Sequence, residues 1–153
     1  MTTLADAIAA PSQRKVDQLL AHYEESHRHP GNERIHFVAI PLIMLSLVGL
    51  LYALHPWVAY VFLAASLVYY ARLSVVFLVT MTLVSAALVG LVMAMGEHVL
   101  PISAAVFVGG WIAQFVGHKM EGRKPSFFED LQYLWVGPIF VLSKLFLKLG
   151  VRW

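Results

Sequence analysis

Long apolar runs separated by short polar turns dominate the chain. A helix needs about 20 residues to cross roughly 30 Å of hydrocarbon. The runs predict spanning helices over residues 35–54, 57–71, 73–95 and 99–117. The second run is somewhat short, but Trp57 begins it, as expected of an aromatic residue at a membrane interface. The pattern therefore favours a bundle of four transmembrane helices.

The N-terminal segment has a different pattern. Residues 1–12 are polar, rich in alanine and expected to be loose. From Ser12, a favourable N-cap, apolar residues recur at helical spacing on one face and predict an amphipathic helix over 13–29. We expect this helix to lie on the bilayer surface or against the bundle, and to end at a turn formed by Pro30 and Gly31.

The C-terminal segment, 131–150, is apolar but does not fit a fifth span. Gly137 and Pro138 interrupt it, and it carries Lys144 and Lys148. A fifth span would also place the C-terminus on the opposite side of the membrane from the other basic residues. We therefore expect a re-entrant or interfacial helix here.

Composition agrees with a membrane protein. Of 153 residues, 59% are hydrophobic and 13% charged, with a mean hydropathy of +0.73, whereas a soluble domain has about 25% charged residues. The expected fold is all-α, a single integral membrane domain over 1–153 with four transmembrane helices, an N-terminal amphipathic helix and a C-terminal re-entrant or interfacial helix. The chain has no cysteine, which excludes disulfides and thiolate metal sites.

The basic residues predict the orientation. In the four-span topology all 11 Lys and Arg residues fall on one side, which the positive-inside rule makes cytoplasmic. This predicts a bacterial inner-membrane protein with both termini in the cytoplasm. The basic residues lie in short loops, so we interpret them as topology signals and lipid contacts and expect no nucleic-acid partner. Arg123 and Lys124 form such a pair, or alternatively hold a substrate carboxylate.

Histidines provide the candidate chemistry. The same topology places five of them at the cytoplasmic face: His22, His27, His29, His36 and His118. Neutral imidazole is a common ligand for iron, zinc and copper. A site of His27, His36 and His118 is sterically reasonable, with either of the other two as a possible fourth ligand. Glu121 is the acidic candidate nearby, as a ligand or as an acceptor for a ring N–H group.

Two polar residues share helix faces with these histidines. Asn32 stands four residues before His36, and Gln114 stands four before His118. Asn32 is equally expected as the N-cap of the first span, and both roles are compatible. The residues alone leave open whether the histidines bind a metal ion or cap helices.

Two motifs resemble those of a known family. The pattern H-x4-N-x3-H, with a proline five residues later, is matched by His27, Asn32, His36 and Pro41. The pattern W-x2-Q-F-x-G-H-x2-E-G-x2-P is matched by Trp111, Gln114, Phe115, Gly117, His118, Glu121, Gly122 and Pro125. In this order they resemble the 2-hydroxy fatty acid dioxygenase family, a fungal enzyme and many bacterial relatives, over roughly residues 15–150.

The resemblance implies an Fe(II)-dependent dioxygenase that uses O2 to convert a 2-hydroxy fatty acid into CO2 and the acid one carbon shorter. The implied roles are iron ligands His27, His36 and His118, orienting residues Asn32 and Glu121, and substrate-binding residues Gln114, Arg123 and Lys124. The fungal form has an extra residue before the glutamate and a histidine where Arg28 stands here, so the fourth ligand stays open between His22 and His29. The implied partners are a fatty acyl substrate, O2 and membrane lipid, with a homo-oligomer left open.

Three other functions are alternatives to this one. Two histidines on different helices could hold a b-type haem. The chain could also be a non-enzymatic membrane protein with structural histidines, although few polar residues lie at mid-membrane, which disfavours transport. A zinc or di-iron lipid hydroxylase is closer, but the long multi-histidine motifs usual for membrane desaturases are absent from the sequence.

Overall fold

Helices are the regular elements throughout the described part of the chain, which comprises residues 14–25, 27–122 and 133–153 of a computed structural model. They are α2 (Lys15–Glu24), α3 (Pro30–Leu54), α4 (Pro56–Ala71), α5 (Val75–Ala94), the short 3-10 helix η1 (Gly96–His98), α6 (Val99–Met120) and α8 (Val136–Leu149). The predicted all-α fold is confirmed. The predicted loose N-terminus, 1–12, and the predicted N-cap Ser12 lie outside the described residues.

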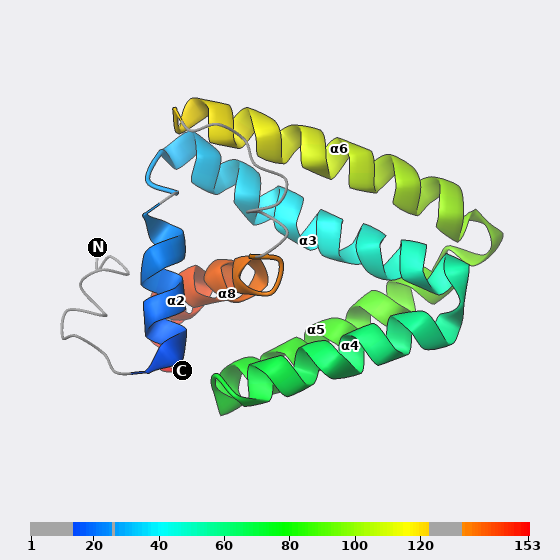
Figure 1. Ribbon diagram of the computed structural model, residues 1–153, viewed down its shortest axis with the longest axis horizontal. Coiled ribbons are helices and arrows are strands. Elements are labelled where there is room, and N and C mark those ends of the chain that lie inside the picture. The colour runs from blue at the N-terminus through cyan, green and yellow to red at the C-terminus, as the bar shows by residue number, and fades with distance from the viewer. Residues whose placement is uncertain (1–13, 26, 123–132) are drawn as a thin grey trace.

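The long helices form two pairs that diverge toward one end of the molecule (Figure 1). α3 packs along α6, and α4 and α5 form a hairpin. At the narrow end, α3, α4 and α5 bury an apolar cluster that includes Val48, Leu63 and Val92. At the wide end, α2 and α8 contribute Leu20 and Phe140 to a second cluster shared with α4 and α5. The two apolar clusters therefore hold opposite ends of the bundle.

Three segments, α3, α5 and η1 with α6, are long and apolar enough to cross a membrane. The predicted span over 57–71 is α4, which has 16 residues; at 1.5 Å per residue it measures about 24 Å, less than the hydrocarbon thickness. Large apolar side chains on the long helices face outward, and Val79, Leu83 and Val108 are more than half exposed. Extended apolar surface of this kind is unusual in soluble monomers. The fourth span stays a prediction.

Several helix boundaries differ from the sequence-based prediction. Pro30 and Gly31 do not form a turn but begin α3, and His29 caps it by accepting a hydrogen bond from the backbone N–H of Gly31. The prediction that Asn32 caps this helix is therefore wrong. Proline suits the first helical position because no N–H is required there and its φ angle is preset. Likewise, Pro138 lies in the first turn of α8 and does not interrupt it.

α8 packs against α2 and α3. Its 14 residues extend about 21 Å, so it is too short to span a bilayer unaided. Its N-terminal turn places Gly137 against Ile40 of α3 and the hydroxyl of Tyr23 of α2. A re-entrant or interfacial position for this helix stays a prediction.

Glycines allow α3 and α6 to approach closely. A methyl group added at Gly110 would lie 2.6 Å from Ile43 Cγ1, and one added at Gly117 would overlap Asn32 Oδ1. Gly109, in contrast, faces open space. The close approach brings the N-terminal turns of α3 next to the C-terminal turns of α6, where the predicted site residues of both helices lie.

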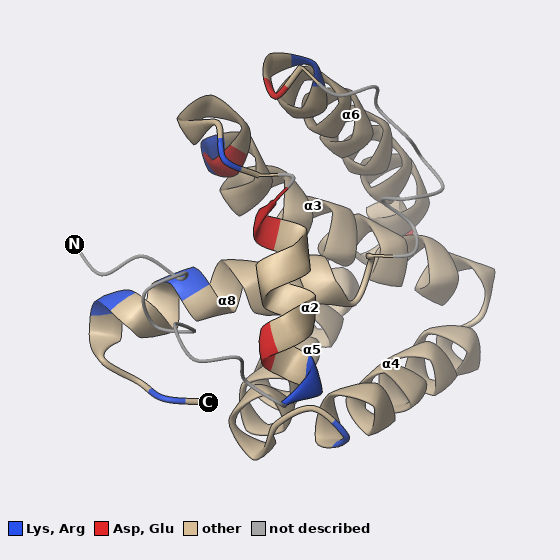
Figure 2. Ribbon diagram, turned by 60° about the vertical axis from the view of Figure 1, so that its left-hand side comes forward, with Lys and Arg blue, Asp and Glu red and all other residues tan. Residues whose placement is uncertain are grey.

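Charged residues gather at the wide end of the bundle (Figure 2). The described basic residues lie in α2, in α8, in the segments next to them, or at the ends of α3, α4 and α6: Arg14, Lys15, Arg28, Arg34, Arg72, Lys119, Lys144, Lys148 and Arg152. The α3–α4 turn and η1, at the narrow end, carry no lysine or arginine. This segregation is the one that the positive-inside argument requires, while the orientation in a membrane stays a prediction.

Candidate metal centre

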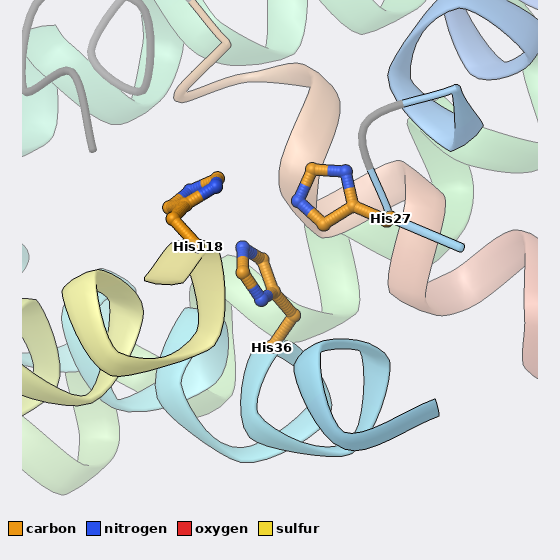
Figure 3. A group of neighbouring side chains, drawn as sticks. All are labelled: His27, His36 and His118. Atoms are coloured by element: carbon orange, nitrogen blue, oxygen red, sulfur yellow. The ribbon is translucent and has the colours of Figure 1, made fainter. Parts of the chain in front are cut away.

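Three buried histidines converge at the wide end of the bundle (Figure 3). His27 lies between α2 and α3, His36 in the second turn of α3, and His118 in the last turn of α6. Their exposed fractions are 4%, 1% and 7%. One nitrogen from each ring lies within 4.8 Å of the others. The structure thus brings together the three residues that the sequence predicts as ligands.

Backbone carbonyls orient two of these rings. His27 Nδ1 lies 2.7 Å from the carbonyl oxygen of Tyr23, and His36 Nδ1 lies 3.0 Å from that of Asn32. A carbonyl only accepts hydrogen bonds, so each Nδ1 carries the proton and each Nε2 presents its lone pair. Metal-binding histidines are usually oriented by such a contact from the second nitrogen. The two rings are therefore preset to coordinate through Nε2.

Aromatic side chains hold His27 in place. The Tyr23 ring stacks on it at 4.1 Å between centroids, and Phe140 of α8 packs at 5.6 Å. Neither residue was predicted from the sequence. Tyr23 could have been found, since it stands four residues before His27 in the helix predicted over 13–29, a spacing that places both side chains on one face. Phe140 comes from a distant helix, and no local pattern identifies it.

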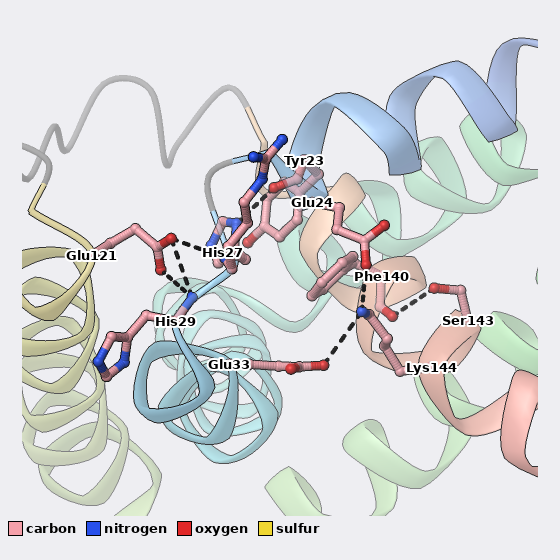
Figure 4. A network of polar contacts seen from close by, with 10 residues as sticks. Tyr23, Glu24, His27, His29, Glu33, Glu121, Phe140, Ser143 and Lys144 are labelled. Atoms are coloured by element: carbon pink, nitrogen blue, oxygen red, sulfur yellow. Dashed lines mark hydrogen bonds and ion pairs between the residues drawn. The ribbon is translucent and has the colours of Figure 1, made fainter. Parts of the chain in front are cut away.

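Glu121 bridges the two motifs (Figure 4). Its carboxylate accepts hydrogen bonds from the backbone N–H groups of Arg28 and His29, each at 2.9 Å, and from Asn32 Nδ2 at 3.0 Å. Both carboxylate oxygens thus bind the segment that carries His27. We call these contacts the Glu121 bridge. Glu121 does not belong to the group of candidate ligand atoms, and its role in orienting ligands or substrate stays a prediction.

The Glu121 bridge lowers the pKa of the Glu121 carboxyl group. Burial alone would raise the pKa of Glu121, but the hydrogen bonds from Asn32 and from the backbone of His29 and Arg28 outweigh it, so the pKa lies below its usual value of 4.5. A carboxyl group with a lowered folded-state pKa stabilises the fold above its unfolded-state pKa. That contribution is lost as the pH falls through the folded-state value.

The variant Glu121→Gln should therefore unfold at a lower temperature than the wild type at neutral pH. The difference should shrink as the pH falls below about 4.5 and through the lower folded-state pKa, because the carboxyl group becomes protonated first in the unfolded and then in the folded wild-type protein. Thermal unfolding of both proteins over a pH series measures this. Glu97→Gln is the control, since Glu97 is exposed at the narrow end. A difference that is independent of pH would contradict a charged Glu121 bridge.

The remaining predicted site residues are more dispersed. His22 is exposed and lies 3.6 Å from Glu25, and His29 caps α3, so the structure brings neither into the three-histidine group. Gln114 is buried one helical turn from His118. Arg123 and Lys124 lie outside the described residues.

An ion-pair network anchors the helix behind His27. Lys144 of α8 contacts Glu24 of α2 at 2.7 Å and Glu33 of α3 at 3.4 Å (Figure 4). Its ammonium also lies 5.2 Å from the centre of the Phe140 ring. Sequence analysis used Lys144 only as a topology signal. The network fixes α8 against α2 and α3 and so keeps Phe140 against His27.

The donor set suits a metal ion. Metal–imidazole bonds of about 2.1 Å place ligand nitrogens up to about 4 Å apart, so small rotations would bring these three onto one ion. Three imidazoles suit iron, zinc or copper and leave coordination positions open for other molecules. The residues present therefore fit a metal cofactor, and the identity of the metal is a separate question.

Two comparisons with known proteins give matches over most of the chain. The sequence profile of a family described as "2-hydroxy-palmitic acid dioxygenase Mpo1-like" matches residues 13–149. The Saccharomyces cerevisiae protein named 2-hydroxy-palmitic acid dioxygenase MPO1 is 29% identical over 138 residues, which cover 86% of this chain and 79% of the yeast protein. No solved structure matches significantly.

Proposed function

Because the chain belongs to the 2-hydroxy-palmitic acid dioxygenase Mpo1-like family, we propose that it is an Fe(II)-dependent dioxygenase of fatty acid α-oxidation. It converts a 2-hydroxy fatty acid and O2 into CO2, water and the acid one carbon shorter. The reaction balances without an external reductant, since the substrate provides the four electrons that reduce O2. The observation that carries the proposal is the convergence of three buried histidines from the two family-like motifs.

Each histidine in this proposal supplies one neutral nitrogen. His27 and His36 keep their protons on Nδ1, which donates a hydrogen bond to the carbonyl of Tyr23 or Asn32, respectively. Fe(II), when bound, supplies redox chemistry for O2 and has open positions at which the hydroxyl and carboxylate groups of the substrate can bind. The fourth ligand proposed from sequence, His22 or His29, would require movement of an exposed side chain. We therefore assign the fourth coordination position to the substrate, not to a histidine.

The surrounding residues position the reactants and limit access of water. Tyr23 and Phe140 cover the His27 ring. Asn32 and Glu121 hold the segment that carries His27 against α6. Gln114 is proposed to hydrogen-bond the polar end of the substrate, and Arg123 or Lys124 to attract its carboxylate. These groups bind and orient, and none of them must transfer a proton in this scheme.

The proposed location is a bacterial inner membrane, with the histidines and both termini on the cytoplasmic side. The exposed apolar faces of α3, α5 and α6 support insertion. The basic residues at the wide end support the orientation. A fatty acyl substrate dissolved in the bilayer would then reach the site from the membrane.

Metal analysis and an activity assay test the proposed function. Protein purified anaerobically in detergent should contain about one iron per chain, as expected for a mononuclear site. It should consume O2 when 2-hydroxypalmitate is added and release CO2. Palmitate, which lacks the hydroxyl group, is the matched control and should not react. Stoichiometric zinc, a haem Soret band, or iron without turnover would each contradict the proposal.

A further inference from the structure

Two narrow cavities lie inside the bundle and share a wall. Both are lined mainly by apolar side chains, and each has a free volume of about 30 Å³. The residues that line both are Met44, Leu134 and Pro138. The cavities are therefore neighbours, separated by little more than these side chains.

The cavities follow α3 away from the histidines. On α3 the first cavity is lined by Ile40, Ile43 and Met44, and the second continues along the same helix to Val48. Ile40 lies one helical turn beyond His36. From His36 to Val48 the helix rises about 18 Å, a length comparable with an extended long-chain acyl tail. The pair forms a narrow apolar path that begins about one helical turn from His36 and His118, at Ile40 and Gln114.

One polar group marks the start of the path. Gln114 lines the first cavity and is 6% exposed, and its Oε1 has no hydrogen-bond partner among the described residues. A buried amide oxygen without a partner costs free energy, so a donor on a ligand would stabilise it. The amide lies one turn from His118. A hydroxyl-bearing head group between Gln114 and the histidines would satisfy it.

The second cavity, which is farther from the histidines, has a mainly apolar wall. Three polar groups in the wall of the second cavity, those of Ser66, Tyr70 and Trp135, bond to one another or to the backbone. Trp135 Nε1 donates to Ser66 Oγ at 2.9 Å, and the Tyr70 hydroxyl donates to the carbonyl of Trp135 at 3.0 Å. These bonds use the donors of Trp135 and Tyr70, and the rest of the wall is mainly apolar, which suits a hydrocarbon chain.

We propose that the two cavities form the binding site for a single unbranched acyl chain, with its polar end at Gln114 and Met44 at the junction that sets the accepted chain length. The narrow bore favours a linear chain over a ring. Methionine is flexible and adapts its shape, so the chain can displace its side chain while passing from one cavity to the next. The inference rests on the proposed function for the identity of the head group, but binding of the chain itself requires neither metal nor turnover.

Tryptophan fluorescence can map the bound chain directly. Trp111 lines the first cavity and Trp135 the second, whereas Trp57 is exposed at the narrow end. Three variants would each retain one of these residues, with the other tryptophans changed to phenylalanine. The probes are palmitic acids brominated near the carboxyl end or near the methyl end, added to metal-free protein in detergent.

Bromine near the carboxyl end should quench the Trp111 variant more strongly, and bromine near the methyl end the Trp135 variant. Both effects should saturate and be reversed by unbrominated palmitate, while Trp57 shows no saturable quenching. Equal quenching of all three would overturn the inference. Because the assay needs no iron and no reaction, its failure is distinguishable from failure of the dioxygenase assignment.

Two substitutions at the junction should act in opposite directions. Met44→Phe should reduce the preference for long over short fatty acids in competition experiments by about tenfold, because about two methylenes lose their buried contacts. Met44→Ala should increase that preference. Met93→Phe is the matched control, since Met93 is exposed on α5. A general loss of folding would not shift the two variants oppositely, and unchanged chain-length preference in both would overturn the role of Met44.

Discussion

Replacing His118 by alanine should remove the metal ion from the purified protein and abolish turnover of 2-hydroxy fatty acids. The substitution leaves two imidazoles, from α3 and from the segment before it, and no other described His, Asp or Glu belongs to the group that could replace the third. Loss of a residue that merely orients a ligand typically costs about 10–100-fold in metal affinity, so loss of a ligand should cost more. Elemental analysis and O2 consumption measure the two effects.

His98→Ala is the matched control for this experiment. His98 is exposed in η1, at the opposite end of the bundle. Its replacement should leave metal content and activity unchanged. Circular dichroism of both variants would show that the helices persist. Full metal content in folded His118→Ala protein would contradict the three-histidine site.

The long helices and the three histidines were predictable because their signals are local. An apolar run of spanning length predicts a helix from its composition alone, as for α3 and α5. His36 and His118 stand at the ends of such runs, and their pairing with Asn32 and Gln114 at helical spacing places each polar pair on one face. The bundle then needs only to bring the two ends together, which the close α3–α6 contact does.

The details that depend on contacts between distant segments were not predictable. A proline followed by glycine is typical of a turn, but Pro30 begins α3. Glu121, some ninety residues later, accepts hydrogen bonds from the backbone just before that helix. The contact of Phe140 with His27 and the cavities along α3 likewise exist only once α8 is packed in place. The spacing of residues along the sequence does not indicate which distant segments come into contact.

The variant Gly117→Ala should weaken metal binding without changing any ligand. A methyl group here would overlap Asn32 Oδ1 and lie 3.5 Å from His36 Cε1. Asn32 is fully buried and bonds both Glu121 and, through its carbonyl, His36, so its displacement would disturb the orientation of the His36 ring. We expect a loss of about 10–100-fold in iron affinity, as for other residues that orient metal ligands. Competition with an iron chelator measures it.

Two neighbouring glycines separate this effect from general damage to the helix contact. Gly110→Ala would press on Ile43, away from the histidines, and should lower the free energy of unfolding by about 1–3 kcal/mol while the iron affinity stays unchanged. Gly109→Ala meets no atom within 4 Å and should be neutral or slightly stabilising, by up to about 1 kcal/mol, because alanine favours a helix. If Gly110→Ala weakened iron binding as much as Gly117→Ala, the Asn32–His36 contact would not be the cause. If only Gly117→Ala did so, the packing of α6 against Asn32 would be part of the metal site.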